Sequence, residues 1–222
     1  DLSSSTARLQ RDIHSGDLEA IVDTLSWLGN TARRNGLQQG LEAQRLWYQK
    51  AERYLIEAVS YGRQLHKKDA SKSQALWSSL FELAYLYEQQ SNYEEAEKKI
   101  FEAREVFKEF LKSKEGDMFA TGGKDYTYYQ WIRRELRAAR LYGAWGKNEM
   151  ADKHYEIAFS IAIENKAMYD AVQCSIFQGF FHELANNLEA ARKAYDRSLD
   201  ILSRLYLDDY TNFVTRRVDK IK

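Results

Sequence analysis

The sequence predicts an all-α fold, and three observations lead to this prediction. The 222 residues include no proline, the residue that most readily ends helices and occupies turns. Apolar residues recur at helical spacing along almost the whole chain. Stretches in which apolar and polar residues alternate between turn residues, the pattern typical of strands, are missing from the sequence. We therefore expect long helices joined by short polar turns.

The apolar periodicity and local start and stop signals divide the chain into about ten expected helices. Asp17 is expected to cap the second helix, and Gly36 and Gly146 are expected stop signals. One long irregular stretch is expected at 113–125, and a connection of this length is either mobile or functional. The expected helices are 5–14, 17–35, 38–67, 71–90, 93–113, 126–145, 148–164, 167–185, 187–205 and 210–220.

The charge balance and the single cysteine narrow the functional classes. Lys and Arg together number 33, as do Asp and Glu, so the formal net charge is zero. This balance argues against a general nucleic-acid or membrane-surface binder, although it does not exclude a local basic patch. No apolar run is long enough for a membrane span. Cys174 can form no internal disulfide, which favours a reducing, cytoplasmic compartment.

The strongest signal in the chain is a pattern of five positions that occurs three times. It reads small, large, small, large, small, and successive copies are separated by 55 and 40 residues. Small residues allow two antiparallel helices to approach closely, and the large ones fill the gaps between them. The copies are Ala84, Tyr87, Ala96, Ile100 and Ala103; then Ala139, Tyr142, Ala151, Tyr155 and Ala158; then Gly179, His182, Ala191, Tyr195 and Ser198.

This pattern resembles the tetratricopeptide repeat (TPR), a helix-turn-helix unit of about 34 residues. The resemblance implies a single TPR-like domain over 1–222, built as a right-handed superhelical array of antiparallel helix pairs, a solenoid. The repeats lack the proline that the family usually carries near the end of each unit, and their spacing is irregular. The expected parts are a divergent helix pair at about 17–67, repeats at 77–110, 132–165 and 172–205, and a capping helix at about 210–220.

The divergent pair keeps the small positions but lengthens the connection between its helices. Gly29 and Ala32 fit the first helix of a repeat, and Ala51, Leu55 and Ala58 fit the second. Gly29 and Ala51 are 22 residues apart, whereas the equivalent residues of the other repeats are 12 apart. Terminal repeats of solenoids are often atypical in this way.

In the TPR family the first helix of each pair lines a concave groove that holds a peptide. The resemblance implies a groove with a basic middle and aromatic flanks, a combination that suits an acidic peptide, because guanidinium groups bind carboxylates in bidentate fashion. The full set of Lys and Asn residues used by carboxylate-clamp members is not present. The groove residues carried over by register are Phe81, Tyr85, Gln89, Arg133, Arg137, Arg140, Gln173, Phe177 and Phe180.

Two stretches of the sequence can be interpreted in a second way. Arg133, Arg134, Arg137 and Arg140 are also typical of a solvated helix face, with Glu135 as a local partner. The aromatic stretch 126–131 is either the start of a helix that packs on the preceding pair or an exposed contact surface.

The leading functional hypothesis is a non-enzymatic module that binds a protein or peptide segment, without a cofactor, a metal or nucleic acid. One alternative is a ligand- or effector-sensing regulatory domain of a larger signalling or transcription protein. Another is a scaffold that self-associates into a homo-oligomer through Trp- and Tyr-rich surfaces. Enzymatic signals are weak: the histidines are scattered, 121–124 lacks the rest of a phosphate-binding loop, and Cys174 has the pattern of a structural thiol.

Overall fold

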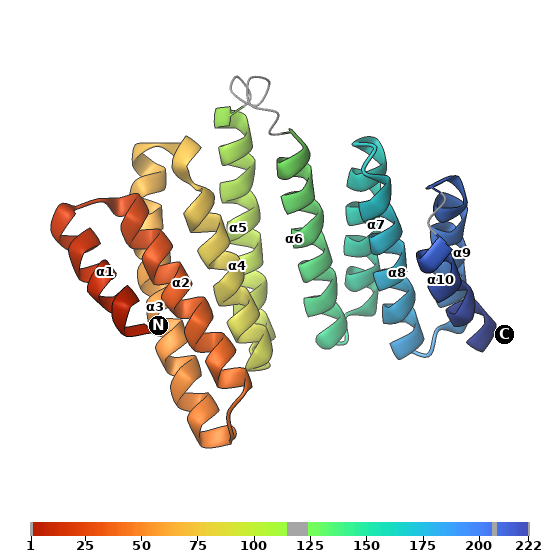
Figure 1. The fold of residues 1–222 in the computed structure, drawn as a ribbon, viewed down its shortest axis with the longest axis horizontal. Helices are drawn as coiled ribbons and strands as arrows, with labels where there is room; N and C mark the ends of the chain where they lie inside the picture. The colour runs from red at the N-terminus through yellow and green to blue at the C-terminus, as the bar shows by residue number, and fades with distance from the viewer. Residues whose placement is uncertain (1, 115–123, 206–207, 222) are drawn as a thin grey trace. The chain divides into compact units, whose positions relative to one another are not determined.

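The computed structural model describes residues 2–114, 124–205 and 208–221, and these form ten α-helices, one short 3-10 helix and no strand. They fall into two compact units, Asp1–Ala120 and Thr121–Lys222 (Figure 1). Unit 1 contains α1 (Leu2–Ser15), α2 (Leu18–Leu37), α3 (Leu41–Lys68), the 3-10 helix η1 (Ala70–Lys72), α4 (Gln74–Gln89) and α5 (Tyr93–Lys114). Unit 2 contains α6 (Lys124–Ala144), α7 (Asn148–Glu164), α8 (Met168–Leu184), α9 (Leu188–Leu205) and α10 (Asp208–Lys220).

The all-helical prediction is confirmed over the described ranges, and helix ends differ from the expected ones by at most three residues. Asp17 caps α2 as predicted, because its side chain accepts hydrogen bonds from the backbone N–H groups of Glu19 and Ala20. The irregular stretch expected at 113–125 is wrong at both ends, where α5 and α6 extend into it. The rest of that prediction falls on residues 115–123, which lie outside the described residues.

Helices of a pair meet where the repeat pattern places its small residues. A Cβ atom at Gly179 would lie 2.3 Å from Cε1 of Tyr195, so only glycine accommodates this ring position. The divergent pair shows the same arrangement, with a Cβ at Gly29 falling 2.6 Å from Cγ of Leu55. The first small position is buried in each of the three clear copies: Ala84, Ala139 and Gly179.

The pairs α4–α5, α6–α7 and α8–α9 share one turn geometry. A residue with positive φ follows the first helix in each pair: Ser91 at 57°, Gly146 at 78° and Asn186 at 56°. The next backbone N–H then bonds the carbonyl five residues earlier, at 2.9 Å in each of Asn92 to Tyr87, Lys147 to Tyr142 and Asn187 to His182. This is the Schellman motif, and it also joins α7 to α8 at Lys166. Its three copies within pairs have the same 55- and 40-residue separations as the five-position pattern, so the turn belongs to the repeat.

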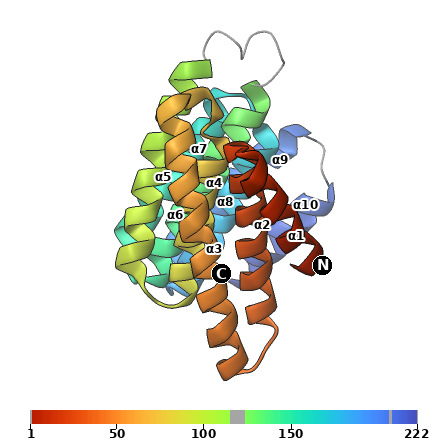
Figure 2. The same ribbon diagram turned by 90° about the vertical axis from the view of Figure 1, so that its left-hand side faces the viewer.

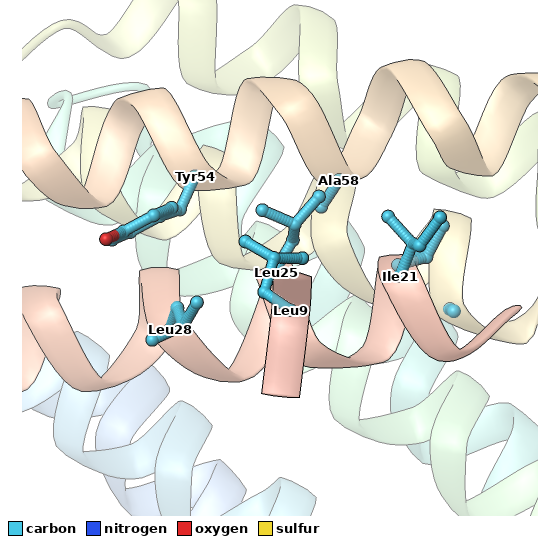
Figure 3. Close-up of a cluster of buried hydrophobic side chains, with 8 residues drawn as sticks. Leu9, Ile21, Leu25, Leu28, Tyr54 and Ala58 are labelled. Carbon is cyan, nitrogen blue, oxygen red and sulfur yellow. The ribbon is translucent and has the colours of Figure 1, made fainter. Parts of the chain in front are cut away.

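Unit 1 is built around the long α2–α3 hairpin. Gly36, expected to stop α2, lies inside its last turn, where an added Cβ would be 2.8 Å from Cε1 of Tyr48. Helix α3 has 28 residues and α4 has 16, and the closed end of the hairpin projects beyond the ends of α4 and α5 (Figure 2). The core of this unit joins residues of α1, α2 and α3 (Figure 3): Leu9, Ile21, Leu25, Leu28, Tyr54 and Ala58.

Unit 2 ends with α10, which packs against the apolar face of α9. Val214 and Val218 of α10 are buried in one cluster with Tyr195 and Leu202 of α9. This contact is the one expected of a helix that covers the last pair. In the described part of the chain, no helix combines the length and the apolar character that crossing a membrane requires.

Candidate partner-binding surface

Six of the nine predicted groove residues lie on α6 and α8 of unit 2. These two helices adjoin in the core, where Ile132 of α6 shares a cluster with Ala171 and Cys174 of α8. On the outside, Arg133, Arg140 and Phe177 are exposed, and Arg137 and Gln173 are half-buried. We call these five the α6–α8 surface: Arg133, Arg137, Arg140, Gln173 and Phe177.

Phe180, the sixth predicted residue in unit 2, lies in contact with α10. Its ring meets the ring of Phe213 edge to face, with centroids 6.1 Å apart, and the guanidinium of Arg217 lies 4.9 Å from its centroid. Arg217 also forms an ion pair with Glu183 at 3.2 Å. A partner that reached Phe180 would therefore compete with α10.

The three predicted residues of unit 1 are on α4 and already make contacts within that unit. Phe81 is 4% exposed, and Tyr85 and Gln89 are half-buried. The Tyr85 ring lies 4.2 Å from the guanidinium of Arg33, which also bonds Glu82 at 3.3 Å. The single groove expected through all nine residues spans both units and stays a prediction.

Two exposed tyrosines extend the α6–α8 surface and were not among the predicted residues. Arg133 donates a hydrogen bond of 2.6 Å to the hydroxyl of Tyr129, one turn earlier on α6. Tyr169 occupies the equivalent position on α8, one turn before Gln173. Each tyrosine lies four residues before a predicted groove residue, so the helical register would have placed both tyrosines on the same face.

The aromatic stretch 126–131 lies in the first turns of a helix, as one of its two interpretations predicted, but its described core contacts are with α7 and α8, which follow it, rather than with the preceding pair. Tyr128 and Trp131 pack against the core cluster of α6, α7 and α8, whereas Tyr129 points outward. The side chains of residues 126 and 127 lie outside the described ones. The stretch therefore contributes aromatic side chains both to the core and to the surface.

The solvated-face interpretation is wrong for Arg134, which is buried. Glu135 is also fully buried, where its carboxylate accepts hydrogen bonds from Trp131 Nε1 at 3.2 Å and from His154 Nδ1 at 2.7 Å. Burial raises the pKa of Asp170 on α8, and the charge of nearby Arg133 partly opposes that shift. The α6–α8 surface itself holds three arginines, and the half-buried carboxyl of Asp170 lies near one of them, Arg133.

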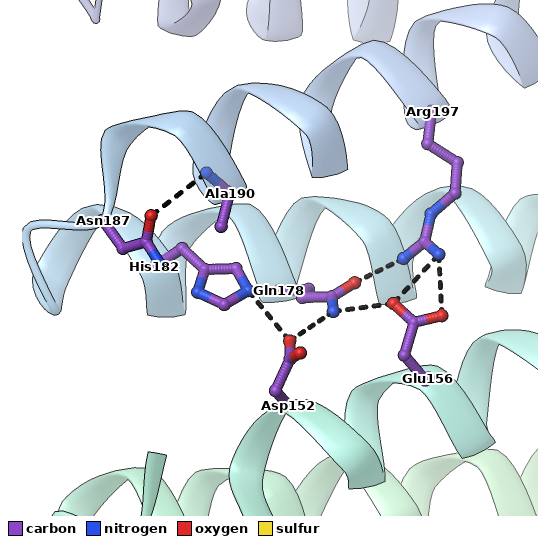
Figure 4. A network of polar contacts seen from close by, with 7 residues as sticks. All are labelled: Asp152, Glu156, Gln178, His182, Asn187, Ala190 and Arg197. Atoms are coloured by element: carbon purple, nitrogen blue, oxygen red, sulfur yellow. Dashed lines mark hydrogen bonds and ion pairs between the residues drawn. The ribbon is translucent and has the colours of Figure 1, made fainter. Parts of the chain in front are cut away.

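A polar network fixes α8 between α7 and α9 (Figure 4). Gln178 donates to Asp152 at 2.6 Å and to Glu156 at 2.8 Å, and His182 donates to Asp152 at 2.8 Å. Arg197 of α9 donates to both carboxylate oxygens of Glu156, at 3.0 and 2.9 Å, and to the Gln178 side-chain oxygen. Such a connected network orients the helices it joins, so α8 presents Phe177 on a rigid support.

The described residues contain no group of three or more His, Cys, Asp or Glu side chains arranged to hold a metal ion. Cys174 is buried, and burial raises the pKa of its thiol to about 12. A thiol with that pKa stays protonated at neutral pH and is a poor nucleophile, in line with the structural role its position indicated.

Comparisons with known proteins bear on the fold. No family model matches the sequence, and no curated protein matches it. Among solved structures, the chain is similar to the crystal structure of BtubC (BKLC) from P. vanneervenii, with a TM-score of 0.63 and 15% sequence identity. The alignment covers 99% of this chain and 89% of that chain. At this level of identity the likeness concerns the fold and carries no function with it.

Proposed function

We propose that this chain is a non-enzymatic helical-repeat protein of the TPR type that binds an acidic segment of another protein on the α6–α8 surface. In this proposal the helix pairs form a right-handed superhelical array, and the protein works in the cytoplasm. The observation that carries the proposal is that α6 and α8, which adjoin in the core, expose arginines and the ring of Phe177 respectively.

The repeat character has two independent supports. The five-position pattern and the Schellman turns recur at identical separations, although the first concerns core side chains and the second concerns the backbone. Of the fifteen residues in the three copies, fourteen are buried, and the half-buried His182 bonds Asp152. A pattern whose members are buried in register is what a stacked repeat requires.

The acidic character of the partner follows from charge and geometry. Arginine binds carboxylates through two parallel hydrogen bonds, and these bonds strengthen where a neighbouring ring excludes water. Phe177 is 43% exposed and supplies apolar area beside the arginines. Because the network of Figure 4 already orders α8, binding would cost little ordering of the receptor.

The proposal is tested with short synthetic peptides that alternate Glu with Leu or Phe, titrated into the purified chain by fluorescence anisotropy. A second set with Lys in place of Glu gives the charge control. We expect the acidic peptides to bind and the basic ones not to. The double variant Arg133→Glu and Arg140→Glu should lower the affinity about tenfold, because two exposed charge pairs of about 0.7 kcal/mol each together contribute about 1.4 kcal/mol.

Arg192→Glu is the matched control, since Arg192 is an exposed arginine on α9 that pairs with Asp196 away from the α6–α8 surface. It changes the net charge per residue by the same amount and should leave the affinity unchanged. If Arg192→Glu lost as much affinity as the double variant, the loss would be explained by net charge and not by the α6–α8 surface. Full binding by the Arg133 and Arg140 double variant would exclude the α6–α8 surface as the site.

A further inference from the structure

The closed end of the α2–α3 hairpin exposes leucines to an unusual degree. Leu37 is 50% exposed, Leu41 85% and Leu46 68%, whereas the other exposed large apolar residues of these two helices, Trp27 and Ile56, are 46% and 49% exposed. The last buried residues before this end are Gly36 on α2 and Tyr48 on α3, which pack against each other. Beyond that contact the hairpin has no core of its own, so apolar area concentrated there points to an interaction.

The same end carries a local positive charge in a chain whose formal net charge is zero. Residues 34–50 contain three basic side chains, Arg34, Arg45 and Lys50, and one acidic side chain, Glu42. Arg34 and Arg45 are exposed. Lys50 lies 5.3 Å from the ring of Trp47, which is half-buried on the same helix.

The shape of this end distinguishes between possible partners. It is the closed end of two helices that project past α4 and α5 (Figure 2), and the three exposed leucines belong to this end. A folded protein partner would need a matching cavity, whereas a fluid lipid surface closes around a projecting apolar end. Leucine and tryptophan beside arginine and lysine is the composition of interfacial helices that lie at the headgroup boundary of anionic bilayers.

We infer that the tip of the α2–α3 hairpin, defined by Leu37, Leu41, Leu46, Arg34 and Arg45, inserts into the surface of an anionic membrane. The leucines enter the boundary between headgroups and acyl chains, and the arginines contact phosphate and carboxylate groups of the lipids. This site lies in unit 1 and is independent of the peptide-binding surface proposed in unit 2.

The test is cosedimentation of the full chain with vesicles of phosphatidylcholine, with and without phosphatidylserine. We expect binding to the serine-containing vesicles that weakens as salt is added, and little binding to phosphatidylcholine alone. The double variant Leu41→Ser and Leu46→Ser should reduce binding at least about tenfold, through lost apolar burial. Arg34→Glu with Arg45→Glu should reduce it similarly and remove most of the salt dependence.

Leu184→Ser supplies the matched control, because Leu184 is 91% exposed at the end of α8, and α9, which follows it, has the acidic Glu189 in its first turn. It should bind the vesicles like the unaltered chain, as should the Arg133→Glu and Arg140→Glu variant. A polarity-sensitive dye on Leu41→Cys gives a second readout, since buried Cys174 does not compete for the label. The dye should shift to the blue with serine-containing vesicles.

Three results would overturn the inference. The first is no binding to serine-containing vesicles, and the second is binding that the leucine substitutions leave unchanged. The third is a concentration-dependent dimer, seen by analytical ultracentrifugation without lipid, that Leu41→Ser and Leu46→Ser abolish, because the tip would then serve a second copy of the chain. Circular dichroism of each variant should match the unaltered chain, since every substituted side chain is exposed.

Discussion

The helix pairs α2–α3 and α8–α9 solve the same packing problem with different turns. In both, a glycine on the first helix, Gly29 or Gly179, receives a large side chain from the second. The α8–α9 pair turns after one more helical turn, through a Schellman motif at Asn186. The α2–α3 pair continues past its core contact and turns through residues 38–40, where Gly40, with φ of −65°, is the N-cap of α3.

The difference shows that the crossing point, rather than the turn, defines a pair of this kind. The crossing needs one small residue facing one large residue, and that requirement is local. The length of helix beyond the crossing can vary, provided that its side chains can be exposed to solvent or can contact a partner. In α8–α9 that length is short and in α2–α3 it is long, so α2–α3 gains a projecting end. Three predictions would break or sharpen this comparison.

Gly179→Ala should have the largest effect, lowering the free energy of unfolding by about 2–3 kcal/mol through overpacking. Three ring atoms of Tyr195 lie within 2.7 Å of the added Cβ, and the Tyr195 hydroxyl is held by Glu183. Gly29→Ala should cost less, about 1–2 kcal/mol, because the added Cβ meets two atoms of one aliphatic side chain, at 2.6 and 2.8 Å, instead of three atoms of a rigid ring, and alanine favours the helix. Urea unfolding followed by circular dichroism measures both, and equal losses would refute the comparison.

Alkaline pH should weaken unit 2 through Cys174, which lies in the core cluster of α6, α7 and α8. Because the folded pKa of this thiol, about 12, lies above its ordinary value of 9.0, its contribution is complete below pH 9 and is lost as pH rises toward 12. By linkage, stability should fall by about 1.4 kcal/mol between pH 8 and pH 10 from this group. Cys174→Ala should show a correspondingly shallower dependence in urea unfolding. Tyrosines contribute equally to both proteins, so identical pH profiles would contradict the burial of this thiol.

The smallest expected effect is the difference in stability between alanine substitutions in two turns, at Gly146 between α6 and α7 and at Gly40 between α2 and α3. Gly146 has φ of 78°, which strains any side chain, so Gly146→Ala should cost about 1 kcal/mol. Gly40 has φ of −65° and open space around it, so Gly40→Ala should change stability by less than about 0.5 kcal/mol. Thermal unfolding compares the two, and hydrogen exchange should report faster opening near residues 141–152 only for Gly146→Ala. The reverse ranking would show that the α2–α3 turn is the constrained one.

The sequence was sufficient to predict the helices and the faces on which they pair, because both depend on spacing along one or two neighbouring segments. It also separated α2–α3 as divergent, from the distance between Gly29 and Ala51. Those features are local, and local periodicity carries them.

The exposure of particular groove residues was beyond the sequence, because it depends on distant neighbours. Phe81 has a groove register but is buried within unit 1, and Phe180 is covered by Phe213 and Arg217 of α10. Leu41 fits an apolar helical pattern yet is exposed, because the α2–α3 hairpin extends beyond the ends of α4 and α5. The network around Gln178 was also missed, although Asp152 and Glu156 stand one turn apart on α7, as do Gln178 and His182 on α8.

The Schellman turns also bear on how the chain is made. Each joins helices that are consecutive in sequence, so closing a pair brings together segments separated by only a few residues and costs little chain entropy. Folding dominated by such short-range contacts is fast. We expect α6 and α7 to close while α8 is still on the ribosome, so that a nascent chain exposes one unpaired helix at a time.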